Sequence, residues 1–70
     1  MEQTTVRAVT AQGWKRNLED GHFPKGTGSL ADYERGKRLL AVWLRELETH
    51  AITPPTYEAC ITVVADWVGV

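Results

Sequence analysis

The spacing of apolar residues predicts a long helix over residues 29–50. Its apolar positions recur at helical intervals, at Leu30, Tyr33, Leu40, Trp43, Leu44 and Leu47. Ser29 followed by Asp32 forms a capping-box-like pair at its start. Gly36 lies on the apolar side, and we expect its missing side chain to let another backbone approach closely.

A shorter helix is predicted on the N-terminal side, over residues 10–20. Thr10 can serve as its N-cap, and Gly21 stands where a helix C-terminal glycine belongs. Residues 1–9 are rich in β-branched side chains, which fit either a short strand or a frayed helical turn.

The third helix is predicted over residues 56–68, after Pro54 and Pro55 have ended the long helix. The run CITVVADWV also fits a strand, because its β-branched residues alternate acceptably. A helix is favoured because three polar residues are spaced four apart and form one narrow stripe, at Glu58, Thr62 and Asp66. The remaining circumference is apolar and exceeds what two short neighbours would bury.

These elements predict an all-α fold for residues 1–70. The chain forms one small three-helix domain, whose two longer helices pair as a C-terminal antiparallel hairpin across the turn AITPP. At 70 residues a chain buries only about 60% of its unfolded surface, so its core is marginal. The single cysteine excludes an intrachain disulfide, which leaves self-association or a larger protein to add stability.

Charge gives no strong indication of a partner. Eight basic residues against nine acidic ones give a net charge of −1, although residues 14–38 carry +2 and residues 39–70 carry −3. The balance lacks the positive field of a dedicated nucleic-acid binder. Neither a membrane span nor a signal peptide is expected, which makes the cytoplasm the predicted location.

Catalysis is not expected from this sequence. His22, His50 and Cys60 lack the spacing that brings metal ligands onto one face, so we expect neither a metal nor a cofactor. Gly21 and Gly26 have the spacing of a phosphate-binding Walker loop, but Thr27 stands where its lysine must be. The protein is therefore predicted not to be an enzyme.

The glycine-rich segment 21–28 allows two interpretations. Gly26 and Gly28 can simply turn the chain between two helices, as a mobile connector. Alternatively, the helix start that follows, together with Lys25, can hold an anion. The connector is favoured because Asp32 already occupies the first helical turn.

Aromatic residues favour protein binding. Three tryptophans and two tyrosines occur in 70 residues, and such side chains dominate interface hot spots, although they also fill small cores. We expect at least two of the three tryptophans to be core residues. The predicted partner contacts are Trp43, Tyr57, Val63 and Trp67, which would bind a larger protein or a second copy of the chain. The expected kind of protein is a small adaptor, inhibitor or antitoxin-like modulator encoded by a phage or mobile element.

The alternative is DNA binding. The segment GWKRNLEDGHFPK resembles the recognition helix and wing of excisionase and AlpA-type winged helix-turn-helix proteins, where a tryptophan precedes a basic helix, a glycine and a proline. The resemblance covers about a fifth of the chain and implies phosphate contacts by Lys15, Arg16 and Lys25 within residues 14–25. About nine residues precede this helix, and a glycine loop with a long helix replaces the wing. The segment ADYERGKRLLAVWLRELETH is similar to a helix near the start of some antitoxins.

Overall fold

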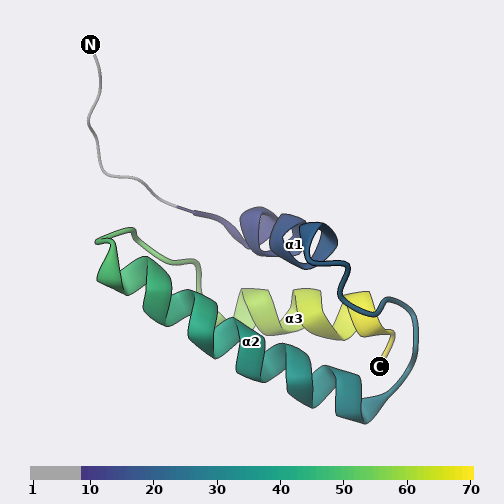
Figure 1. Cartoon of the computed structure of the whole chain (residues 1–70). Helices are drawn as coiled ribbons and strands as arrows, with labels where there is room; N and C mark the ends of the chain where they lie inside the picture. Colours follow the sequence, from purple (N-terminus) through teal and green to yellow (C-terminus); the bar gives the residue numbers. More distant parts are fainter. Residues whose placement is uncertain (1–8) are drawn as a thin grey trace.

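Three helices make up the regular structure of residues 9–70, the part of the chain that the computed structural model describes (Figure 1). They are α1 (Ala11–Asp20), α2 (Leu30–Thr49) and α3 (Tyr57–Val68). Each helix lies within one residue of its predicted ends. The predicted all-α, three-helix fold is therefore confirmed for the described residues. Of residues 1–9, for which a strand or a frayed turn was predicted, residues 1–8 lie outside the described part, and Val9 belongs to no helix or strand.

The predicted N-caps fix where two of the helices begin. The Ser29 hydroxyl accepts a hydrogen bond from the Asp32 amide at 3.2 Å, and the Thr56 hydroxyl accepts one from the Ala59 amide at 3.3 Å. Thr10 precedes α1 but makes no side-chain capping bond. A cap of this kind stabilises a helix by about 1 kcal/mol, so α2 and α3 have better defined starts than α1.

Helix α3 lies at the centre of the domain. It runs antiparallel to α2 on one side and packs against α1 on the other (Figure 1). The predicted polar stripe of α3 is exposed, as expected. With α1 and α2 both packed on α3, Tyr57 and Ala59 are still exposed, and Ile61, Val63 and Ala65 are half-buried. The buried core consists of Trp14, Leu18, Leu40, Leu47, Cys60, Val64, Trp67 and Val68.

Two helices are followed by a left-handed residue that is not glycine. Gly21 has a φ of −85°, so it does not take the left-handed conformation predicted for a C-terminal glycine. His22 takes it instead, with a φ of 54°, and Ala51 does the same after α2 with a φ of 57°. In both turns the next amide reaches back, from Phe23 to the Leu18 carbonyl at 3.0 Å and from Ile52 to the Leu47 carbonyl at 2.9 Å.

Gly36 is buried where α2 meets α3. A Cβ atom at this position would lie 2.7 Å from Cγ1 of Val64 and 3.4 Å from Cζ of Phe23. The expectation of a close approach is correct, but side chains rather than another backbone occupy the space. The absent side chain thus allows α3 to pack tightly on α2.

The connection between α1 and α2 is hydrogen-bonded to the end of α3. The amide of Gly26 donates to the Trp67 carbonyl at 2.8 Å, and the amide of Gly28 donates to the Val68 carbonyl at 2.7 Å. The Trp67 indole N–H in turn donates to the Phe23 carbonyl at 2.9 Å. These bonds oppose the prediction of a mobile connector, because they hold the loop against the C-terminal turn of α3.

Candidate functional site

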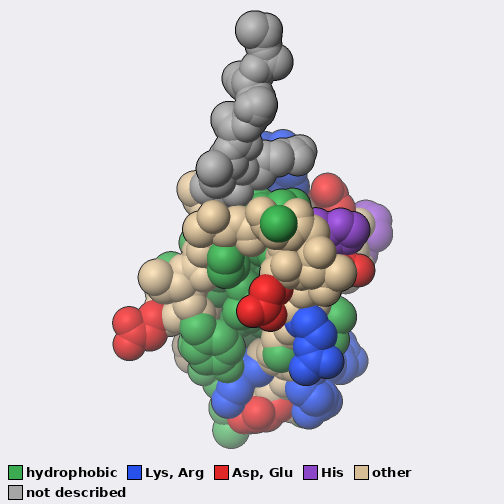
Figure 2. Space-filling view, turned by 90° about the vertical axis from the view of Figure 1, so that its left-hand side faces the viewer, with side chains coloured by type: hydrophobic (Ala, Val, Ile, Leu, Met, Phe, Trp, Pro, Cys, Tyr) green, Lys and Arg blue, Asp and Glu red, His purple; other side chains and the backbone are tan. Residues whose placement is uncertain are grey.

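An apolar groove runs along the end of the molecule where α2 turns into α3. It encloses about 550 Å³ and is formed by the C-terminal half of α2, the turn, and the first residue of α3. Figure 2 views this end and shows apolar side chains exposed among charged ones. The lining residues are Ala41, Leu44, Arg45, Glu48, Ala51, Ile52, Thr53, Pro54, Pro55 and Tyr57.

The local sequence explains why the groove stays open. Pro54 and Pro55 lack amide hydrogens and have a restricted φ, so the segment between α2 and α3 cannot fold as continuous helix. The amide of Val9 donates to the Thr53 carbonyl at 3.1 Å, which ties the turn to the residue that leads into α1. Tyr57 follows the prolines and remains 49% exposed on the wall of the groove.

The groove has a mixed rim. Arg45 and Glu48 are exposed charged residues on its α2 side, whereas Leu44 and Ile52 are half-buried beneath. A concave apolar surface with opposite charges at its edge is suited to binding an apolar group that is flanked by polar ones. The groove thus combines an apolar floor with charges of both signs at its rim.

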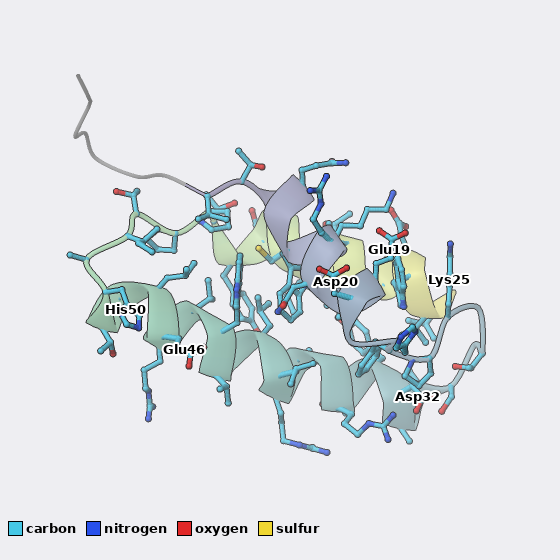
Figure 3. All side chains as sticks on the ribbon, turned by 45° about the horizontal axis from the view of Figure 1, so that its top comes forward. Glu19, Asp20, Lys25, Asp32, Glu46 and His50 are labelled. Carbon is cyan, nitrogen blue, oxygen red and sulfur yellow. The ribbon has the colours of Figure 1, made fainter. Side chains whose placement is uncertain are left out.

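A second, polar recess lies at the opposite end of the domain, between α1, the glycine loop and α3. Lys15, Arg16 and Lys25, the three residues predicted to contact an anion, all line it. The recess encloses about 260 Å³, and its other lining residues are Gln12, Glu19 and Trp67. In Figure 3 Lys25 and Glu19 lie together, far from His50 at the end of α2. The structure thus gathers cations that are ten residues apart in the sequence.

Lys25 is held beside the core. Its ammonium group lies 4.8 Å from the ring centre of Trp67, a cation–π contact. The adjoining hollow is lined by Val63, Asp66 and the same lysine. Two carboxylates, Glu19 and Asp66, therefore accompany the three cations, so the local field is only weakly positive.

The four predicted partner contacts lie in three different places. Tyr57 lines the apolar groove, Trp43 is half-buried between α1 and α2, and Val63 lies half-buried beside the basic recess. Trp67 is only 8% exposed, which makes it largely a core residue. With Trp14 fully buried, at least two tryptophans belong to the core, as predicted.

Sequence reasoning missed most of the groove. Its prolines were interpreted only as helix breakers, and Ala41 and Ile52 lie outside the apolar stripe that predicted α2. Leu39 and Val42 were also missed, although they are 43% and 63% exposed on α2. Their exposure could have been predicted, because both residues lie outside the apolar stripe of the helix and therefore face away from the core.

The cysteine and the two histidines lie apart: Cys60 is buried in α3, whereas His22 and His50 are exposed at the ends of α1 and α2. Burial raises the pKa of the Cys60 thiol above its usual value, which disfavours the reactive thiolate. His50 caps α2, and His22 follows α1. Within the described residues no three His, Cys, Asp or Glu side chains gather as a metal site would need, and no helix there is long and apolar enough to cross a membrane.

Comparison of the chain with protein-family models, with curated proteins and with solved structures found no match.

Proposed function

We propose that the protein is a non-enzymatic interaction module that binds another protein through the apolar groove between α2 and α3. The observation that carries this proposal is the exposed Tyr57 on the wall of a concave, largely apolar surface. Aromatic side chains at such surfaces contribute large contact area with little loss of conformational freedom. The roles that fit are those of a small adaptor, inhibitor or antitoxin-like modulator.

The groove favours one kind of partner segment. Its apolar floor accepts one or two apolar side chains, while Arg45 and Glu48 on the rim can pair with flanking charges of both signs. A short amphipathic segment of the partner meets both requirements. A strongly charged, uniformly acidic or basic segment does not.

Capture from a lysate of the source cells tests this proposal. The wild-type chain is compared with Ala41→Lys, which places a charge in the groove, and with Thr62→Lys, which lies on the exposed polar stripe of α3. We expect one protein to be captured by wild type and Thr62→Lys and lost with Ala41→Lys. The captured protein is then purified and rebound, and equal binding of all three variants would count against the groove.

A second candidate function is nucleic-acid binding at the basic recess, supported by the convergence of Lys15, Arg16 and Lys25. Contacts to phosphates release counterions, so affinity for DNA or RNA would fall steeply with salt. Nuclease treatment of the lysate separates the two candidates. Capture that survives nuclease and tolerates a Lys15→Ala, Arg16→Ala double variant favours the groove, whereas loss in both cases favours the recess.

A further inference from the structure

One side of α2 carries exposed residues at the spacing of a helix-pairing seam. Arg35, Leu39, Val42, Glu46 and Thr49 follow one another at intervals of four, three, four and three residues, and all five are exposed. Gly36, Leu40 and Leu47, which α2 buries, lie on another side of the helix. Alternating intervals of three and four keep side chains along one stripe, as in a two-helix coiled coil.

The centre of this seam is apolar and lies next to a hollow. Leu39 and Val42 are 43% and 63% exposed, the latter among the most exposed large apolar residues of the described chain. The hollow encloses about 290 Å³ between α1 and α2. Its lining residues are Asn17, Gly21, Leu39, Val42, Trp43 and Glu46. A side chain from a second helix can enter it and cover both the apolar pair and Trp43.

The seam is self-complementary about its own midpoint. Leu39 and Val42 lie at equal distances in sequence on either side of the Leu40–Ala41 bond, and Arg35 and Glu46 do the same further out. In an antiparallel pair of identical helices, Leu39 therefore faces the partner's Val42. Arg35 faces the partner's Glu46, and the two-fold axis repeats both contacts. A parallel pair would instead place Arg35 against the partner's Arg35.

We propose that this seam binds a second copy of the chain, with the two α2 helices antiparallel. Charge complementarity favours this occupant, because the two-fold symmetry pairs Arg35 of each chain with Glu46 of the other chain. Arg38 and Arg45 flank the seam on one side and are exposed, so their guanidinium groups can remain in solvent. The contact is small, and the dimer is consequently weak and concentration-dependent.

The proposed dimer leaves the groove accessible. Leu44 and Glu48, which α2 contributes to the groove, lie on a different side of the helix from Leu39 and Val42, whereas Ala41 and Arg45 lie between the groove and the seam. The inference therefore goes beyond the proposed function and does not depend on it. A dimer would present two grooves, which raises the avidity for a partner that carries two binding segments.

Sedimentation equilibrium with purified chains tests the dimer directly. We expect wild type to dimerise reversibly, and Arg35→Glu or Glu46→Arg alone to weaken dimerisation at least tenfold through like charges at both ends. An equimolar mixture of these two variants should dimerise again, as should the double variant Arg35→Glu, Glu46→Arg. A wild-type chain that stays monomeric at every concentration would overturn the proposal, as would single variants that dimerise like wild type.

The fold of each variant is checked by circular dichroism, because Arg35 also pairs with Asp32 at 3.4 Å and lies 5.4 Å from the Phe23 ring centre. If Arg35→Glu unfolds, Glu46→Arg and Val42→Lys decide the question. The matched control is Leu30→Lys, since Leu30 is 69% exposed on α2 but outside the seam. Loss of dimerisation by Val42→Lys and its retention by Leu30→Lys support the seam, and equal behaviour overturns it. A groove variant on α3, such as Tyr57→Lys, should still dimerise, so failure of the groove and failure of the seam are distinguishable.

Discussion

The indole rings of Trp14 and Trp43 lie 5.0 Å apart at their centres, with their planes tilted by 37°. Trp14 belongs to α1 and is fully buried, whereas Trp43 belongs to α2 and is half-buried. Both helices pack mainly on α3, so this aromatic pair joins the two outer helices directly. Aromatic pairs at this separation add about 0.5–1.5 kcal/mol beyond the area they bury.

Replacing Trp14 should therefore unfold the domain. Trp14→Ala removes a fully buried ring, which costs about 3–5 kcal/mol, as much as a core of this size supplies. Trp14→Phe should cost far less, because it keeps a ring and removes an indole N–H that has no hydrogen-bond partner in the described structure. Urea unfolding followed by circular dichroism measures both variants, and equal losses would contradict this account.

Glycine should stabilise the ends of the first two helices. Ala51 has a φ of 57° and His22 a φ of 54°, a left-handed conformation that costs a residue with a side chain about 1–2 kcal/mol. Ala51→Gly and His22→Gly should thus each raise the free energy of unfolding by about 1 kcal/mol, less the entropy that glycine adds to the unfolded chain. Gly69→Ala is the reverse control. Its φ is 92° and its Cβ would meet nothing closer than 3.7 Å, so any loss comes from the backbone conformation.

These backbone features show where prediction from sequence succeeds and fails. The caps at Ser29 and Thr56 were predictable because they depend on residues three positions apart. The left-handed residues were not predictable. Gly21 is the residue type expected there, but the left-handed conformation occurs one residue later, at His22. The local sequence pattern predicts that a helix ends. Which residue becomes left-handed depends on the contacts of the residue after it, Phe23 in one turn and Ile52 in the other.

Contacts between residues that are far apart in the sequence could not be predicted either. Gly36 was recognised as a contact point, but nothing in the sequence indicated that Val64 and Phe23 would fill the space. Lys25 joins Lys15 and Arg16 only because the loop binds the end of α3. The candidate sites depend on such tertiary contacts, and the periodicity that predicted the helices carries no information about them.

A side chain at Gly36 should destabilise the protein although it favours the helix. Gly36→Ala gains about 1 kcal/mol of helix propensity, but its Cβ would lie 2.7 Å from Cγ1 of the fully buried Val64. Valine is stiff at χ1 and cannot easily move away, so a net loss of about 1–2 kcal/mol is expected. In a double-mutant cycle, Val64→Ala should cost less in the Gly36→Ala background than in wild type. Additive effects would show that the two positions do not clash.

The stability of the protein should depend on Cys60 at alkaline pH. Because burial raises the pKa of this thiol, the folded state favours the neutral form. Its contribution is fully present below the unfolded pKa of about 8.5 and is lost as pH rises through the folded value. Wild type should lose free energy of unfolding through this thiol above about pH 9, and Cys60→Ala should not. The difference in the free energy of unfolding between the two proteins should therefore narrow as pH rises above about 9. A constant difference across that range would show that the Cys60 thiol has the same pKa in the folded and unfolded states.

Amide hydrogen exchange should reveal a fixed loop rather than a mobile connector. The Gly26 and Gly28 amides donate to the last carbonyls of α3 at 2.8 Å and 2.7 Å, so their exchange should be slowed together with that of α3. The Lys25 and Thr27 amides have no such acceptor among the described residues and should exchange quickly. Alternation of slow and fast exchange along four consecutive residues is a pattern that a freely moving loop cannot produce. Uniformly fast exchange would restore the mobile connector predicted from the sequence, and Lys25 would then have no fixed position beside Lys15 and Arg16 from which to bind a phosphate.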